Sequence, residues 1–320
     1  MKKRLRPRRG LCLALAFLLA LLGSCPGLAA ELVPQGGQEP LPLSGVSFLS
    51  LADPGVGMVR RQVPILMYHH LYEEPDSPET EVNANALSVD QFEEQLSYLK
   101  ENGYTAVSIE QLTRYVERGW ALPRKPVCIT FDDGYLSNYQ LAFPLLKKYN
   151  MKATIFVIGS TVGDTEYYKD TQFPITPHFD YEQAQEMAES GLVSIQSHTY
   201  DMHQTPAYET GPAIRETVLK LPGETEEQYA QALEQDFLRS KAEIETATGQ
   251  QVTALAYPKG ACDSRSEEIL EGLGVKVTFT VRAATATLIQ GDTDSLRRLP
   301  RYWVKPSTTL ETFRQWLGEK

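Results

Sequence analysis

Cysteine is scarce in this sequence of 320 residues. There are four cysteines, and two of them, Cys12 and Cys25, lie within the first 30 positions. The remaining two, Cys128 and Cys262, are too few for a disulfide framework, and no cysteine-based metal site is available. Cys128 lies in an apolar run typical of a strand, so we expect it to pack as a small hydrophobic side chain.

Basic residues are also scarce beyond the N-terminus. Residues 1–30 hold six basic residues and no acidic one, which leaves 25 basic against 41 acidic residues and a formal net charge of -16 for the rest. Such an acidic body argues against nucleic acid and anionic membrane surfaces as partners, because both would repel it. It does not distinguish between neutral and cationic glycans.

The N-terminus has the pattern of an export signal. A basic stretch precedes the apolar run Leu11–Leu22, and small residues follow as far as Ala30. The apolar run is shorter than the roughly 20 residues that span a bilayer as a helix. We therefore expect residues 1–30 to be a signal peptide or a lipoprotein signal, and the mature protein to be secreted or attached to the cell envelope. Leu22–Cys25 resembles the lipobox of bacterial lipoproteins, so lipid attachment at Cys25 and an uncleaved anchor are the alternatives.

Residues 31–60 are rich in Gly, Pro, Ser and Leu and predict a linker, followed by one domain over 61–320. Short apolar runs then alternate with amphipathic stretches. Strands are expected at 63–68, 127–131, 153–158, 193–196, 252–257, 275–281 and 299–304. Helices are expected at 89–102, 109–119, 139–149, 181–190, 225–248, 264–273 and 309–317. Apolar strands separated by helices predict an α/β fold with a parallel sheet, namely a distorted or incomplete (β/α) barrel of about seven strands.

Two adjacent carboxylates follow one of these apolar strands. Asp132 and Asp133 come directly after Phe131 and before Gly134. Side chains alternate along a strand, but a turn assisted by glycine can direct both carboxylates towards the mouth of the barrel. Two close carboxylates repel each other, and a bound cation relieves that repulsion. The pattern indicates a functional site, and a solvated Asp-Asp-Gly turn is the alternative.

Two of the five histidines, His198 and His203, follow another apolar strand. At this spacing they lie about 140° apart on a helix and on opposite faces of a strand, so they converge only if the segment is a loop. A barrel builds its active site from such loops. Two neutral imidazoles and one carboxylate form the open ligand set of a catalytic zinc. We therefore predict a divalent metal, with zinc as the first choice and cobalt, nickel or iron as alternatives.

These segments resemble the motifs of a known family. Thr130–Tyr135 and Ser197–His203 are similar to the first two motifs of the NodB-type polysaccharide deacetylases (carbohydrate esterase family 4). The likeness covers about residues 63–305 and includes Pro64–His70. It implies a hydrolase that removes N-acetyl groups from an N-acetylhexosamine polymer, such as peptidoglycan, poly-N-acetylglucosamine or a chitin-like glycan.

The resemblance also implies a role for each residue. Three side chains would hold the metal: Asp133, His198 and His203. Asp132 would act as the general base on a water at that metal. Ala256–Gly260 matches the third motif, which implies that the backbone N–H of Tyr257 stabilises the oxyanion. A buried structural tyrosine is the alternative for Tyr257.

The chain departs from the family pattern in three places. The commonest second motif spaces its histidines one residue closer than His198 and His203. The third motif usually carries an arginine that orients the base, and Ala256 stands there; Arg301 is the predicted replacement, with a surface arginine as the alternative. The late Leu-x-His motif, whose histidine protonates the leaving amine, is absent. We expect His69 or His70 to supply this acid, and favour His69 because only one of two adjacent side chains need face inward.

Two other classes of function stay open. A deacetylase-like protein that binds glycan with little turnover would fit the altered motifs. A non-haem iron oxygenase would fit two histidines and a carboxylate, although the second Asp and the motif order argue against it. The aromatic segment Val162–Tyr181 predicts either a sugar-stacking loop or an ordinary one, and His178 within it is expected at the surface. The sequence identifies neither the polysaccharide nor the oligomeric state.

Overall fold

The computed structural model describes residues 58–73, 85–209 and 213–319. The predicted signal over 1–30 and nearly all of the predicted linker lie outside the described residues, so cleavage and lipid attachment at Cys25 stay predictions. Among the helices of the described ranges, none combines the length and apolar character needed to cross a membrane.

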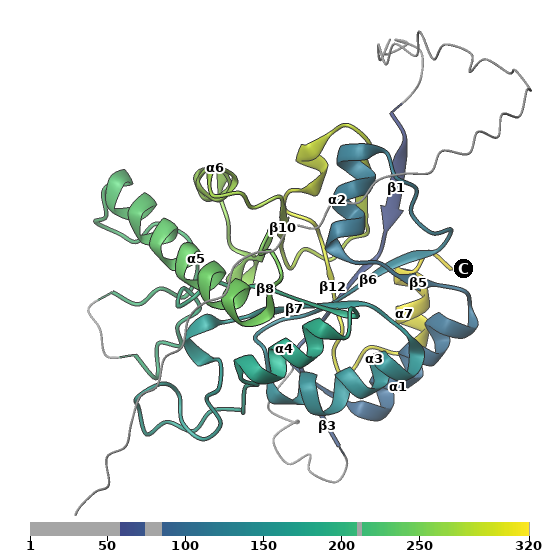
Figure 1. Ribbon diagram of the computed structural model, residues 1–320, viewed down its shortest axis with the longest axis horizontal. Helices are drawn as coiled ribbons and strands as arrows, with labels where there is room; N and C mark the ends of the chain where they lie inside the picture. The colour runs from purple at the N-terminus through teal and green to yellow at the C-terminus, as the bar shows by residue number, and fades with distance from the viewer. Residues whose placement is uncertain (1–57, 74–84, 210–212, 320) are drawn as a thin grey trace, which may run out of the picture. The chain divides into compact units, whose positions relative to one another are not determined.

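Seven parallel strands form the central sheet in the order β10-β9-β8-β7-β6-β2-β12 (Figure 1). Their bounds are β2 Ile65–Tyr68, β6 Pro126–Phe131, β7 Ala153–Val157, β8 Val193–Ser197, β9 Ala254–Ala256, β10 Val277–Phe279 and β12 Tyr302–Trp303. The last strand, β12, pairs with the first strand of the sheet, β2. Between the outer strands β10 and β12, a single bridge joins Phe279 to Leu299 in place of a full ladder. The predicted incomplete barrel is thereby confirmed.

Seven α-helices accompany the strands in the described ranges. They are α1 Val89–Glu101, α2 Ile109–Arg118, α3 Phe143–Tyr149, α4 Tyr181–Glu189, α5 Glu226–Thr248, α6 Ser264–Gly272 and α7 Leu310–Trp316. Ser108 begins α2 with a capping box, and Gly119 ends α2 in the left-handed conformation with φ 68°. The helix expected from Tyr139 begins one residue earlier, as a π-helical turn over Asn138–Ala142 that leads into α3.

Three short pairings lie outside the main order of the sheet. β1 (Arg60–Val63) runs antiparallel to β11 (Ala286–Ile289). β3 (His70–Tyr72) pairs with β4 (Ala86–Ser88), and β5 (Thr105–Ala106) pairs with the start of β6. The strand predicted over 63–68 is therefore two strands, since β1 ends at Val63 and β2 begins at Ile65. Proline at 64 has no N–H to donate to a ladder, which suits a break at this point.

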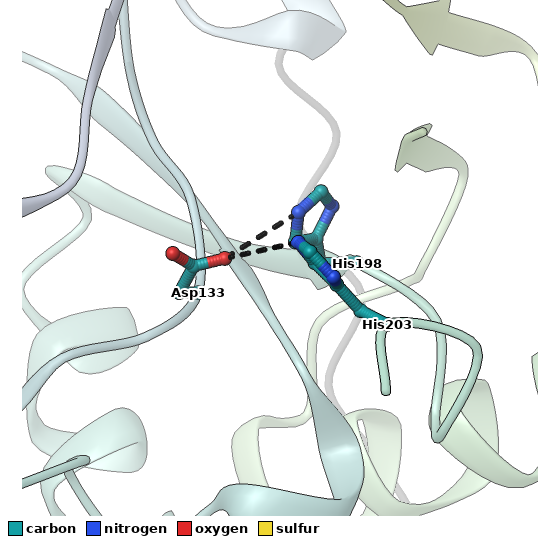
Figure 2. Close-up of side chains that lie close together, drawn as sticks. All are labelled: Asp133, His198 and His203. Atoms are coloured by element: carbon teal, nitrogen blue, oxygen red, sulfur yellow. Dashed lines mark ion pairs between the residues drawn. The ribbon is translucent and has the colours of Figure 1, made fainter. Parts of the chain in front are cut away.

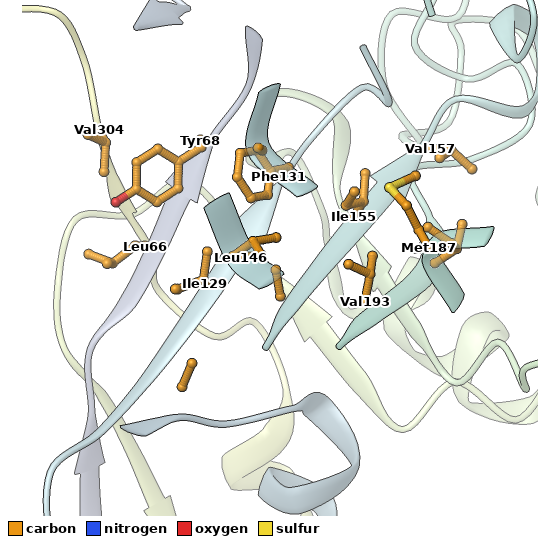
Figure 3. Packing of buried hydrophobic residues seen from close by; sticks show 14 of the residues in the cluster. Leu66, Tyr68, Ile129, Phe131, Leu146, Ile155, Val157, Met187, Val193 and Val304 are labelled. Carbon is orange, nitrogen blue, oxygen red and sulfur yellow. The ribbon is translucent and has the colours of Figure 1, made fainter. Parts of the chain in front are cut away.

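Along each strand, successive side chains point to opposite faces of the sheet, and the apolar ones on the two faces belong to two separate hydrophobic clusters. One cluster holds Leu66 and Tyr68 of β2 with Ile129 and Phe131 of β6, and packs against helices; Leu146 of α3 and Met187 of α4 lie over the strands in Figure 3. The other cluster takes the opposite parity and fills the barrel interior, and side chains of α2, β1 and β11 also belong to it. Its members include Ile65, Cys128, Phe156, Ala256 and Phe279. Parity at each strand end therefore decides which residues face the interior.

Cys128 is fully buried in the interior cluster, as expected for a small hydrophobic side chain. It forms no disulfide, and neither does Cys262. Burial raises the pKa of the Cys128 thiol to about 12, so it is neutral at physiological pH.

Phe92 of α1 supports two strands that lead into the polar strand ends. It is fully buried, and its ring centre lies 5.1 Å from that of Tyr68 and 5.5 Å from that of Phe131. We expect Phe92→Ala to lower the free energy of unfolding by about 3–5 kcal/mol, because it removes apolar contacts and leaves a cavity. Denaturant unfolding followed by circular dichroism measures this. Leu238→Ala is the control, since Leu238 is 42% exposed, and should change the free energy by less than about 0.5 kcal/mol.

Candidate active site

Asp132 and Asp133 leave β6 in different conformations. Asp132 continues the parity of Cys128 and Thr130 and so faces the barrel interior. Asp133 would face the helices, but its φ of 73° and the φ of 86° at Gly134 turn the chain at this point. A Cβ at Gly134 would approach Val157 Cγ1 to 3.0 Å, so the turn requires glycine both for space and for conformation. The predicted glycine-assisted turn is confirmed.

Arg301 forms a two-pronged ion pair with Asp132. Two guanidinium nitrogens each lie 2.7 Å from one carboxylate oxygen, and both side chains are almost completely buried. The guanidinium also donates to the carbonyl of Thr280 at 3.1 Å. Burial acts to raise the pKa of Asp132, but Arg301 together with His198 and His69 outweighs it and holds that pKa below its ordinary value. The contact predicted between Arg301 and Asp132 is therefore present, and Arg301 is not a surface residue.

His198 is held from two sides at the end of β8. Its backbone N–H donates to the carbonyl of Val157 at 2.8 Å, and its ring Nδ1 lies 2.7 Å from the carbonyl of Ala256. Because a carbonyl can only accept, Nδ1 carries the proton and Nε2 is left as a free electron-pair donor. His203 lies across the loop, with its ring 5.1 Å from that of His198 in an edge-to-face arrangement.

Three donor atoms converge in the way that a metal ion requires. Asp133 Oδ1 lies 3.5 Å from His198 Nε2 and 3.9 Å from His203 Nε2 (Figure 2). These separations are too long for good hydrogen bonds, yet they approach the roughly 3.3–3.5 Å between ligands of a tetrahedral zinc. Asp133 Oδ1 is buried and has no hydrogen-bond partner in the described structure, so it is an orphaned donor atom aimed at this point. The residues fit a divalent cation.

The protonation states agree with this interpretation. Burial and the neighbouring His198 lower the pKa of His203 to about 4, so the ring is neutral near pH 7 and free to bind metal. Burial acts to raise the pKa of Asp133, but the nearby histidines outweigh it and keep that pKa below its usual value. The carboxylate of Asp133, the ring of His198 and the neutral ring of His203 therefore surround the same point.

The structure separates His69 from His70. His69 has the parity of Ile65 in the barrel interior, whereas His70 has the parity of the helix-facing residues. His69 interacts electrostatically with Asp133 and Asp132, although burial is the larger influence and lowers its pKa. His70 instead places Nδ1 at 3.0 Å from the hydroxyl of Ser137. His69 is therefore the imidazole that faces the carboxylates.

Tyr257 does not offer the donor that was expected of it. Its backbone N–H donates to the carbonyl of Phe279 at 3.0 Å, within the β9–β10 pairing. Its hydroxyl donates to Glu267 Oε1 at 2.9 Å, and its side chain is fully buried. Tyr257 is therefore a buried structural residue in this conformation, because its N–H is already hydrogen-bonded within the sheet and is not free to bind an oxyanion.

The prediction that His178 lies at the surface is wrong. His178 is buried, with its ring 5.0 Å from that of Tyr135, because a bridge pairs these two residues next to Asp133. Of the aromatic residues, Tyr168 is also buried, and so is Phe179, whereas Tyr167 and Phe173 are exposed. The segment therefore buries some of its aromatic side chains and leaves Tyr167 and Phe173 exposed. A loop rich in proline gave no periodic signal from which this burial could be predicted.

Comparison with known proteins agrees with the geometry. A family model described as polysaccharide deacetylase matches residues 120–278. YxkH of Bacillus subtilis, named as a candidate polysaccharide deacetylase, is 29% identical over 312 residues, which cover 93% of this chain and 95% of YxkH. The structure of IcaB from Ammonifex degensii superposes with a TM-score of 0.62 and 30% identity, covering 80% of this chain and 97% of IcaB. The chain belongs to the polysaccharide deacetylase family.

Another relative of this deacetylase carries a named substrate. The poly-β-1,6-N-acetyl-D-glucosamine N-deacetylase of Escherichia coli K12 is 30% identical over 234 residues. The match covers 69% of this chain but only 34% of the E. coli protein, so the chain spans about a third of that relative's length.

The ion pair of Arg301 with Asp132 generates a prediction about stability. Arg301→Met leaves a buried carboxylate without its partner and should lower the free energy of unfolding by about 3–5 kcal/mol. Denaturant unfolding of the metal-free protein measures this. Adding Asp132→Asn should cost less than the two single losses combined, because no unpaired charge remains; strict additivity would contradict the coupling. Arg314→Met is the control, since Arg314 is 49% exposed and lies 3.8 Å from Glu319.

Proposed function

We propose that the chain is an exported, metal-dependent hydrolase that removes N-acetyl groups from an N-acetylhexosamine polymer at the cell envelope. The observation that supports this most is the convergence of Asp133, His198 and His203 beside the pair of Asp132 with Arg301. The E. coli relative is named for poly-β-1,6-N-acetyl-D-glucosamine, which makes that glycan the first substrate to test. Peptidoglycan and chitin-like polymers present the same acetamide group.

Asp133, His198 and His203 would hold the metal, with zinc preferred and cobalt, nickel or iron as alternatives. When bound, the metal supplies Lewis acidity that polarises the acetamide carbonyl and acidifies a water molecule. The Nδ1 contact of His198 with Ala256 fixes the ring in the tautomer that ligation needs.

The side chains then divide the proton transfers between them. Asp132 takes the proton from the water that attacks the carbonyl carbon, and Arg301 holds the carboxylate so that one geometry is available. His69 follows the neighbouring strand β2 and faces the carboxylates. In its protonated form it would donate a proton to the nitrogen as the carbon–nitrogen bond breaks. The products are acetate and a free amine on the sugar.

Acetate release tests the proposal. The purified protein should release acetate from β-1,6-linked N-acetylglucosamine oligomers, lose this activity with a chelator, and regain it with zinc or cobalt. Asp132→Asn should lower kcat by at least about 100-fold while metal remains bound, because the general base is lost but the ligands stay. Full activity of that variant would remove Asp132 from the base role. Metal and glycan binding without acetate release would favour the glycan-binding alternative.

The two adjacent histidines give a matched test of the acid. His69→Gln should lower kcat by about 100-fold or more, whereas His70→Gln should change it by less than about 10-fold, because only His69 faces the carboxylates. Steady-state kinetics with the same oligomers measures both. An equal loss in the two variants would contradict the assignment.

Export is a separate part of the proposal. The pattern over residues 1–30 supports a cleaved signal, with lipid attachment at Cys25 as the alternative. Mass spectrometry of the mature N-terminus would distinguish them, since cleavage near Ala30 removes Cys25 and lipidation makes it the first residue.

A further inference from the structure

A tight turn, Thr199–Met202, joins the two histidine ligands. Thr199 has a φ of 73°, in the left-handed region that non-glycine residues seldom adopt. The Ser197 hydroxyl accepts the N–H of Thr199 at 3.0 Å, and the Thr199 hydroxyl accepts the N–H of Met202 at 3.1 Å. The two N–H groups between them, on Tyr200 and Asp201, need acceptors from outside the turn. Successive N–H groups beside a left-handed residue form a concavity suited to an anion.

One carboxylate on α5 fills this concavity. Asp236 Oδ1 accepts the N–H of Tyr200 at 2.8 Å, and Asp236 Oδ2 accepts the N–H of Asp201 at 2.7 Å. Each oxygen therefore takes one donor, and both distances are short, as in charge-assisted hydrogen bonds. An amide at this position could accept from only one of the two N–H groups.

The neighbouring residues on the same face of α5 contact the turn as well. Ser240 lies four residues after Asp236, and its hydroxyl is 2.8 Å from the hydroxyl of Ser197. Arg239 lies three residues after it, with its guanidinium 3.7 Å from the centre of the Tyr200 ring. Residues three and four apart share one face of a helix, so α5 presents a single surface to the turn.

This surface matters most for His203. His198 has its own backbone and side-chain contacts to Val157 and Ala256. His203 stands beyond the turn, one residue further along than in the commonest form of the motif. Its position relative to Asp133 therefore depends on the shape of the turn.

We propose that Asp236 is a positioning residue, which fixes the turn so that His203 reaches the metal together with Asp133 and His198. The inference rests on the metal site of the proposed function. Helix α5 thereby sets the affinity for the metal without contributing a ligand.

Metal affinity of purified protein is the main measurement. Asp236→Ala should weaken the binding of zinc, measured by competition with a chromophoric chelator, by about 10–100-fold, the usual range for partners that orient ligands. Asp236→Asn should lose less, because one acceptor remains. Amide hydrogen exchange of the metal-free protein should also show faster exchange at Tyr200 and Asp201 in Asp236→Ala.

Glu245→Ala is the matched control. Glu245 is also a carboxylate of α5 that accepts a backbone N–H, that of Val252 at 2.9 Å, but it lies away from the turn. It should leave zinc affinity unchanged within about twofold. Unchanged affinity in Asp236→Ala, or an equal loss in Glu245→Ala, would overturn the inference while leaving the metal site intact. Absence of zinc binding by the unaltered protein would instead count against the proposed metal site, and against this inference with it.

Discussion

The buried ion pair between Arg301 and Asp132 is the contact on which the site depends. Asp132 follows the end of β6, and Arg301 directly precedes β12. Arg301 is also two residues after Leu299, which forms the single bridge to Phe279 of β10. The rings of Phe156 and Phe279 lie near the guanidinium, so the pair is enclosed by apolar side chains. Burying two charges costs free energy that a good geometry only partly recovers. In exchange for that cost, the pair holds the Asp132 carboxylate in one orientation and keeps it ionised.

The other functional side chains follow from the same sheet. Parallel strands bring their carboxyl ends to one edge, so Asp132, His198 and His69 arrive together from β6, β8 and β2. Where the alternation of side chains along a strand would point a residue away from the site, the backbone departs from regular strand geometry. The positive φ values of Asp133 and Thr199 mark these two places. Such strain persists only where surrounding contacts hold it, as Asp236 does for the turn between the histidines.

Most of the architecture could be predicted because its physical signals are local. Apolar runs bounded by turns and capped amphipathic helices gave each of the seven main strands and helices within a few residues. The predictions that were wrong concerned contacts between residues far apart in the chain. Tyr257 was expected to offer its N–H to an oxyanion, but pairing with β10 engages it, and no periodicity in the sequence reveals that register. His178 was expected at the surface because a loop rich in proline gives no sign of what packs over it.

The sequence by itself determined the class of fold, the family and the residue types of the site, because these depend on local patterns of apolar, acidic and imidazole side chains. Only the tertiary structure decided which members of each set are used. It chose His69 over His70 through the parity of β2, and it placed Arg301 where Ala256 leaves a gap in the third motif. It also brought Asp236 to the turn from a position 36 residues beyond Tyr200 in the chain. These choices depend on which strands and helices become neighbours in space, and that is a property of the folded chain as a whole.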